Sequence, residues 1–246
     1  MSLPSPSMDS LLILVPAFNE EAAIGRVVAE IREAAPGVPV VVVDDCSRDS
    51  TASTARAAGA QVLRLPFHLG LGGAVQAGYK LAFELGFEFV IRLDGDGQHD
   101  PTYIAKVYEA LRTSSCQMVI ASRFEDGAVS HSSFLRGLGI RFFRLVLRPI
   151  LGKPVHDPTS GFVGVNRAAL QVFSTSFPLE YPEIEALVVL QRKAFRFVEI
   201  PCRMRARLGG RSSITAGKSL YYIFHVLMGV FVNVLKYEGR RQRKRK

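Results

Sequence analysis

The stretch that decides the fold is Phe89-Val90-Ile91-Arg92-Leu93-Asp94-Gly95-Asp96-Gly97-Gln98-His99-Asp100-Pro101. An apolar, β-favouring run ends in two carboxylates two positions apart, and Gly95 between them lets a ligand approach closely. Because side chains alternate along an extended chain, Asp94 and Asp96 point to the same side, and Gln98 can add a third oxygen. Oxygen ligands suit Mg²⁺ or Mn²⁺, which share their shell with substrate phosphates. The stretch predicts a strand that ends in a cation site, although a solvated acidic turn has the same local pattern.

Short apolar runs alternate with amphipathic segments along the chain. Buried strands are predicted at residues 11–15, 40–43, 61–65, 118–121, 162–165 and 195–200. Helices are predicted at residues 20–35, with Asn19 as the N-cap, and up to residue 58, with Gly59 just after the last turn. Later helices are predicted at residues 101–112 and 181–193. This alternation predicts an α/β fold, with a Rossmann-like, mostly parallel sheet flanked by helices.

A polar cluster follows each of three predicted strands. The clusters are residues 16–20, Asp44-Asp45 and Asp94-Gly95-Asp96. Ligands of parallel sheets bind at the carboxyl ends of the strands, so the three clusters are expected at one edge of the sheet. The positions of the strand ends bring them together and predict a ligand site at this edge.

A glycine-rich segment, residues 68–78, precedes Asp94 and runs into a helix that is predicted to end at residue 85. Backbone N–H groups at such a helix start can accept a phosphate. The same glycines also permit close packing of the helix. The pattern therefore leaves a phosphate site and a packing role open.

The second half of the chain carries arginines and glutamates that can serve a ligand site. A helix predicted at residues 136–151 presents Arg136 on a basic face, which is either solvated or a wall for an anionic acceptor. Arg207 lies in a cationic loop whose composition suits closure over phosphates. Glu183 and Glu185 stand at a predicted helix start, where they act as a base or complement the helix dipole.

The formal net charge of +9 is unevenly distributed along the chain. Six basic residues stand together at the end: Arg240, Arg241, Arg243, Lys244, Arg245 and Lys246. A nucleic-acid binder would spread its basic residues over a folded face with aromatic residues between them, so no nucleic-acid partner is expected. A basic end instead suits anionic lipid headgroups.

Residues 219–235 carry no formal charge, but they are shorter than the ~20 apolar residues of a membrane span. A narrow polar stripe at helical spacing is formed by Lys218, His225, Gly229, Asn233 and Lys236. This pattern predicts an amphipathic helix at the membrane interface, or a helix that packs on the body, on a second subunit or on a membrane-protein partner. The predicted divisions are a leader (1–10), a main domain (11–213), the amphipathic helix (214–239) and a basic tail (240–246).

Five motifs follow one another along the chain. They are Val15-Pro16-Ala17-Phe18-Asn19-Glu20, Asp44-Asp45-Cys46-Ser47-Arg48-Asp49-Ser50-Thr51, Gly70-Leu71-Gly72, Asp94-Gly95-Asp96-Gly97-Gln98-His99-Asp100-Pro101 and Ser122-Arg123-Phe124. Together they resemble the family 2 glycosyltransferases of GT-A fold, and within them the dolichol-phosphate mannose synthase group and its bacterial polyprenyl-phosphate relatives. The resemblance covers about residues 11–213. It implies inverting transfer of a hexose from a nucleotide diphosphate sugar, of the GDP-mannose or UDP-glucose type, to a polyprenyl phosphate at the cytoplasmic face of the membrane.

The resemblance also implies roles for individual residues. The donor nucleotide would be held by Pro16, Phe18, Glu20, Asp45 and Gly95. Asp96 and Gln98 would bind Mg²⁺ or Mn²⁺ on the diphosphate, and Asp94 would touch the ribose or the metal. The acceptor phosphate and the donor diphosphate would be bound by Arg123, Arg136 and Arg207. The chain departs from the group at Phe18, where a Tyr is common, and at Ser213, where a Lys is common.

The expected chemistry depends on the acceptor. A phosphate is already anionic at neutral pH and can attack the anomeric carbon without a general base, provided that cations offset its repulsion from the diphosphate. A sugar hydroxyl would need a carboxylate base, for which Glu183 or Glu185 is the candidate. A non-catalytic nucleotide-sugar-binding subunit is the remaining alternative. We expect the phosphate acceptor, and therefore a metal-dependent hexosyltransferase that is peripheral to the membrane.

Overall fold

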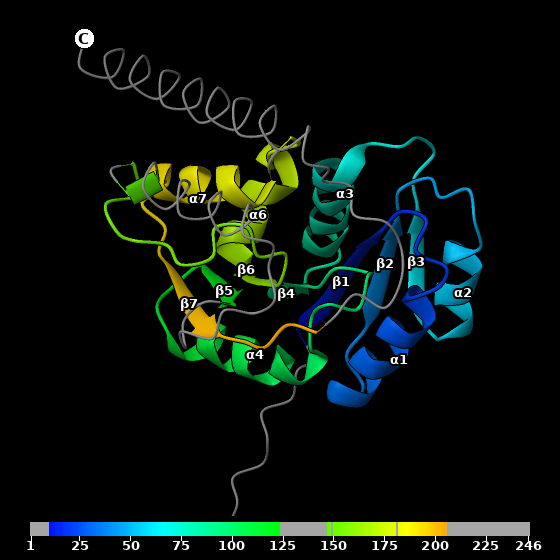
Figure 1. The fold of residues 1–246 in the computed structure, drawn as a ribbon. Helices are drawn as coiled ribbons and strands as arrows, with labels where there is room; N and C mark the ends of the chain where they lie inside the picture. The colour runs from blue at the N-terminus through cyan, green and yellow to red at the C-terminus, as the bar shows by residue number, and fades with distance from the viewer. Residues whose placement is uncertain (1–9, 124–146, 149, 181, 206–246) are drawn as a thin grey trace, which may run out of the picture.

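The computed structural model of the protein describes residues 10–123, 147–148, 150–180 and 182–205. These residues form a seven-stranded sheet with the strand order β3-β2-β1-β4-β6-β5-β7 (Figure 1). The strands are β1 (Leu11–Ala17), β2 (Val40–Asp44), β3 (Gln61–Arg64), β4 (Phe89–Arg92), β5 (Met118–Ser122), β6 (Val163–Asn166) and β7 (Phe197–Pro201). Only β6 runs antiparallel to its neighbours in this described sheet. The predicted mostly parallel sheet is confirmed.

Helices cover both faces of the sheet (Figure 1). They are α1 (Ile24–Ala34), α2 (Thr51–Ala57), α3 (Gly70–Glu84), α4 (Ile104–Thr113), α6 (Arg167–Ser176) and α7 (Pro182–Arg192), with a 3₁₀ turn η1 (Pro101–Tyr103) before α4. Strand β1 is buried on both faces, and its side chains alternate between two cores. Leu12 and Leu14 pack in the core that contains residues of α3, α6 and α7, whereas Leu11, Ile13 and Val15 pack in the core with α1, α2 and α4. The chain is therefore a three-layer α/β/α fold.

The start of α1 differs from the prediction. The helix begins at Ile24, and Asn19 is not its N-cap, since its backbone is left-handed with φ of 54°. The side-chain Oδ1 of Asn19 instead accepts a hydrogen bond from Arg48 N at 2.9 Å. The predicted apolar face of Ile24, Val27, Val28 and Ile31 is buried as expected. The cap was wrong because this polar loop is held by a partner loop 29 residues away in sequence and not by its own helix.

Helix α6 was not predicted from the sequence. Asn166 is its N-cap, and the Asn166 side chain accepts a hydrogen bond from Ala169 N at 3.2 Å. The buried residues Leu170 and Phe173 then recur at helical spacing. An Asn followed by this apolar pattern is a helix-start signal that the sequence carried.

The glycine-rich segment opens α3, and its glycines serve packing. A Cβ on Gly72 would lie 2.4 Å from the carbonyl oxygen of Leu179, and one on Gly78 would lie 2.4 Å from Leu14 Cδ1. Gly70 has a φ of 76°, in the left-handed region that glycine adopts readily. These contacts favour the packing interpretation of the segment.

Several predicted features lie outside the described residues. They are residues 1–9 of the leader predicted at 1–10, most of the helix at residues 136–151, and everything from residue 206 onward, including the amphipathic helix and the basic tail. Within the described part of the chain, no helix combines the length and the apolar character that crossing a bilayer requires.

Candidate active site

The carboxyl ends of β1, β2 and β4 lie side by side, because β1 pairs with both of the other strands. The loops after β1 and β2 are joined by hydrogen bonds. Asn19 N donates to Ser47 Oγ at 2.9 Å, and Glu20 N donates to Thr51 Oγ1 at 2.8 Å. Pro16 is part of β1, and its carbonyl oxygen would lie 3.3 Å from a Cβ on Gly95. The three predicted polar clusters therefore meet at one sheet edge.

Asp45 organises the first part of this edge. Its buried carboxylate accepts a hydrogen bond from Leu69 N at 2.7 Å and lies 2.8 Å from His68 Nδ1. The His68 ring is half exposed and packs against the ring of Phe18, with 4.2 Å between the centroids. Phe18 is 40% exposed. The edge thus presents a pair of exposed rings next to a buried carboxylate, which suits a flat, polar ligand such as a nucleobase.

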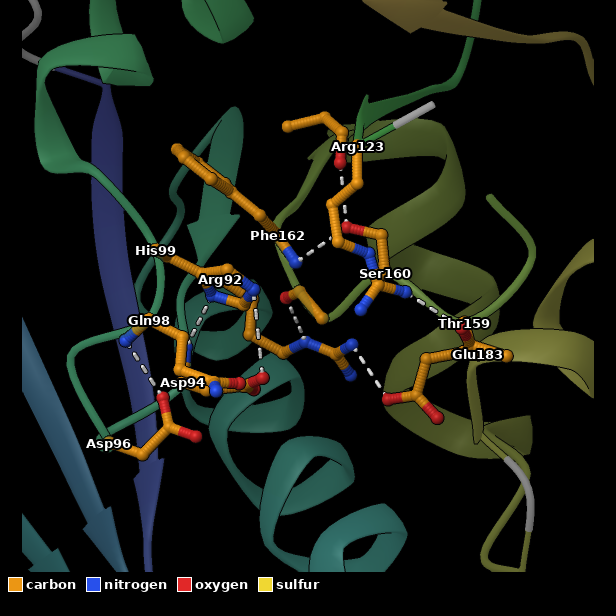
Figure 2. A network of polar contacts seen from close by, with 12 residues as sticks. Arg92, Asp94, Asp96, Gln98, His99, Arg123, Thr159, Ser160, Phe162 and Glu183 are labelled. Atoms are coloured by element: carbon orange, nitrogen blue, oxygen red, sulfur yellow. Dashed lines mark hydrogen bonds and ion pairs between the residues drawn. The ribbon is translucent and has the colours of Figure 1, made fainter. Parts of the chain in front are cut away.

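Asp94 and Asp96 form the acidic part of the edge (Figure 2). Asp96 is buried, and its Oδ1 accepts a hydrogen bond from the backbone N–H of Gln98 at 3.0 Å. Asp94 Oδ1 is also buried, and it has no hydrogen-bond partner among the described residues. An unpartnered buried carboxylate oxygen is costly unless a ligand satisfies it.

His99 lies directly behind Asp94. Its Nδ1 accepts a hydrogen bond from Asp94 N at 3.1 Å, so the proton of the neutral ring is on Nε2, which faces Asp94 Oδ2 at 3.8 Å. Burial lowers the pKa of His99, which keeps the ring neutral. The sequence prediction left His99 as a turn residue, and the structure shows it in contact with Asp94.

The acidic pair fits a divalent cation that is shared with a ligand. The described residues contain no cluster of three or more His, Cys, Asp or Glu side chains that could hold a metal by themselves. Mg²⁺ is usually bound by one or two carboxylates together with substrate phosphates. Two neighbouring carboxylates, with Asp94 Oδ1 still unpartnered, match that second kind of site.

Arg92 is the buried cation beside these carboxylates. Its side chain is only 2% exposed, Nε donates to the Gly161 carbonyl at 2.9 Å, and Nη2 donates to Glu183 Oε1 at 2.9 Å. Burial acts to lower the pKa of Arg92, but Glu183, Tyr79 and Asp94 together outweigh it and hold the pKa above its ordinary value. Glu183 therefore serves as the counter-ion of Arg92, and Glu185, two residues on, is itself buried.

Arg123 stands at the end of β5, where its guanidinium is held by Asp157. Nε and Nη2 donate to the two carboxylate oxygens at 2.6 Å each, and Nη2 also donates to Thr159 Oγ1 at 2.8 Å. Although burial opposes it, this pairing raises the pKa of Arg123 above its ordinary value. The other two predicted arginines, Arg136 and Arg207, lie outside the described residues.

Three residues of this network were not singled out as site residues from the sequence. They are His68, Arg92 and Asp157. Arg92 carried a signal, since a charge inside a buried strand needs a partner. His68 and Asp157 stand in loops, and nothing local to them indicates which carboxylate or arginine they meet.

Comparison with known proteins gives the following matches. The sequence model of the family described as Glycosyl transferase family 2 matches residues 12–173. An undecaprenyl-phosphate mannosyltransferase of Micrococcus luteus is 28% identical over 217 residues, which cover 84% of this chain and 88% of that protein. A dolichol-phosphate mannosyltransferase of Pyrococcus furiosus is 30% identical over 237 residues, which cover 92% of this chain and 64% of that protein.

Among solved structures, glucosyl-3-phosphoglycerate synthase from Mycobacterium tuberculosis, in complex with Mn²⁺, UDP and phosphoglyceric acid, superposes with a TM-score of 0.71. The sequence identity is 22%, and the superposition covers 94% of this chain and 84% of that chain. This likeness concerns the fold, and it agrees with the predicted GT-A class.

Proposed function

We propose that this chain, which belongs to glycosyl transferase family 2 and is a glycosyltransferase, transfers a hexose with inversion from a nucleotide diphosphate sugar to a polyprenyl phosphate. The observation that carries the proposal is the sheet edge where exposed rings, a buried carboxylate and the unpartnered Oδ1 of Asp94 lie together. Two of the relatives act, by their names, on undecaprenyl phosphate and dolichol phosphate. Their names support the lipid acceptor.

The donor nucleotide would bind at the ends of β1 and β2. Pro16 and Glu20 would contact the nucleoside from the loop after β1, and Asp45 would hydrogen-bond the base or ribose. Phe18, with His68 behind it, offers a ring on which a base can stack. Gly95, where a Cβ would lie 3.3 Å from the Pro16 carbonyl oxygen, would contact the donor through its backbone.

The divalent ion would be held by Asp94, Asp96 and Gln98 together with the donor diphosphate. When bound, Mg²⁺ or Mn²⁺ supplies positive charge that stabilises the departing nucleoside diphosphate. The contribution of this chain is to hold the two carboxylates on one side of the strand end. His99 contributes by fixing the backbone N–H of Asp94.

The acceptor phosphate would bind near the arginines on the other side of the site. Arg123 is already held by Asp157, so part of its charge is neutralised inside the protein. We therefore assign a larger share of phosphate binding to Arg136 and Arg207. Their positive charge would offset the repulsion between two anionic reactants.

No general base is assigned in this proposal. Glu183 is one of the two candidates for a reaction on a sugar hydroxyl, but its Oε1 accepts a charge-assisted hydrogen bond from Arg92 at 2.9 Å. Burial raises the pKa of Glu183 above its ordinary value and outweighs this hydrogen bond, which acts to lower the pKa. The engagement of Glu183 as the counter-ion of Arg92, and not its pKa, is what supports the phosphate acceptor over a glycan hydroxyl.

The acceptor is tested by incubating the purified chain and Mn²⁺ with radiolabelled GDP-mannose or UDP-glucose and a polyprenyl phosphate in detergent. We expect label in the organic phase after extraction. Label that appears only on an added oligosaccharide would contradict the lipid acceptor. Omission of Mn²⁺ and Mg²⁺, with EDTA present, is the control and should abolish the product.

We further propose that the enzyme is peripheral on the cytoplasmic face of the membrane, through an amphipathic helix around residues 219–235 and the basic tail. A chain that ends at residue 218 should no longer float with vesicles that contain anionic lipid. If the shortened chain still floats as the full chain does, this helix is not the anchor.

A further inference from the structure

We infer that Arg92 is a positioning residue, which holds the carboxylate of Asp94 in place by tying the end of β4 to the turn at Gly161 and to the start of α7. The inference rests on the proposed function, because Asp94 belongs to the proposed cation site. Figure 2 shows the guanidinium of Arg92 reaching from the side of Asp94 to Glu183.

Within the described part of the chain, no hydrogen bond to the carboxylate of Asp94 sets its orientation. Oδ1 has no hydrogen-bond partner among the described residues, and His99 Nε2 is 3.8 Å from Oδ2, beyond a hydrogen bond. Packing must therefore set it. A Cβ on Gly161 would lie 2.3 Å from Asp94 Oδ2 and 2.6 Å from Oδ1, so the backbone of Gly161 is the wall on which the carboxylate rests.

Arg92 in turn holds the backbone of Gly161 in place. Its Nε donates to the Gly161 carbonyl at 2.9 Å, and the two residues are 69 positions apart in sequence. On the other side, Nη2 binds Glu183 at the start of α7. One buried guanidinium thus joins the strand that carries Asp94, the turn that confines Asp94, and a helix from the second half of the chain.

The role needs the shape of arginine as well as its charge. Two donors at fixed angles reach a carbonyl and a carboxylate at once, and the single ammonium of lysine cannot reproduce both contacts. The positive charge of Arg92 also acts on both Asp94 and Glu183, two carboxylates that repel each other. Loss of the side chain should therefore let both Gly161 and Asp94 move.

The test measures Mn²⁺ binding in the presence of UDP or GDP, with the free ion followed by its electron paramagnetic resonance signal. Arg92→Gln should weaken Mn²⁺ binding about tenfold or more, the range seen when groups behind metal ligands are removed. Arg92→Lys should recover part of the affinity. Steady-state kinetics should show a lower kcat and an unchanged KM for the acceptor.

Arg167→Gln is the matched control. Arg167 contacts the opposite end of the same strand region, with Nη1 donating to the Phe87 carbonyl at 3.0 Å and Nε lying 3.5 Å from Glu88. It is not near the proposed site, so its Mn²⁺ affinity and kcat should match the wild type. A similar loss in this variant would indicate a general effect on the sheet and would overturn a specific role for Arg92.

The inference is overturned if Arg92→Gln folds and binds Mn²⁺ within twofold of the wild type. If Arg92→Gln does not fold, Arg92→Lys and Glu183→Gln decide the question, and unchanged Mn²⁺ affinity in both overturns it. A Glu183→Gln variant that binds Mn²⁺ normally but loses about 100-fold or more in kcat would identify a base and overturn the role of the pair. A wild type that binds Mn²⁺ with a nucleotide but makes no lipid product would contradict the proposed acceptor and leave this inference standing.

Discussion

Two buried arginines flank the site, and their partners differ in kind. Arg123 forms a two-pronged pair with Asp157, both N–O distances are 2.6 Å, and the Asp157 side chain is fully buried. Arg92 divides its donors between a carbonyl and Glu183, whose side chain is 16% exposed. Arg123 is bound to one turn, at Asp157 and Thr159, whereas Arg92 joins three separate segments. We therefore expect the Arg123 pair to govern stability and the Arg92 pair to govern the orientation of Asp94.

The largest effect is expected from Asp157→Ala. Removal of one partner leaves the charge of Arg123 buried without its counter-ion, which costs about 3–5 kcal/mol of unfolding free energy. Urea unfolding followed by circular dichroism measures the loss. Glu183→Ala should cost less, because the guanidinium of Arg92 loses one hydrogen bond whereas that of Arg123 loses two. Equal losses in the two variants would break the distinction between the two pairs.

Asp96→Ala should show the opposite behaviour, a loss of activity without a loss of stability. In the fold, its Oδ1 accepts a hydrogen bond from Gln98 N. The proposed metal, in contrast, stabilises the transition state by several kcal/mol. Turnover should therefore fall on the order of 1,000-fold, with the urea midpoint close to that of the wild type. Activity that persists in the presence of Mn²⁺ would refute Asp96 as a metal ligand.

Gly161→Ala tests how closely the backbone of Gly161 must pack against Asp94. The new methyl group would lie 2.3 Å from Asp94 Oδ2, so the carboxylate must shift. A displacement of about 1 Å at a reacting site can cost roughly 100-fold in rate. We expect this loss in kcat together with weaker Mn²⁺ binding. Normal Mn²⁺ affinity in Gly161→Ala would show that the cation site tolerates a shift of the Asp94 carboxylate.

Gly72→Ala is a substitution of the same kind away from the acidic pair. Its methyl group would meet the backbone of Leu179 at 2.4 Å and push α3 away from the turn before α7. Overpacking of this kind costs about 1–3 kcal/mol of stability. The Mn²⁺ affinity of the folded fraction should be unchanged. A loss of Mn²⁺ affinity in Gly72→Ala would mean that the acidic pair responds to strain from any part of the sheet.

The sequence predicted most of the first half of the chain. Strand and helix periodicity gave β1, β2, β3 and β4 in order, and Gly59 follows α2 with a left-handed φ of 94° as predicted. The N-cap at Asn19 was wrong, because cap signals describe a residue's own helix and Asn19 is bound by a loop from elsewhere in the chain. The direction of β6 and the existence of α6 were likewise not recognised.

Local pattern by itself determined that carboxylates would stand at strand ends on one edge, because parallel strands present the same end and extended chains alternate their side chains. Only the tertiary structure decided which charges meet there. Arg92 pairs with Glu183, which is 91 positions away in sequence, and Arg123 pairs with Asp157, which is 34 positions away. Such pairs depend on how a strand, a turn and a helix from distant parts of the chain pack together, and no local periodicity records that packing.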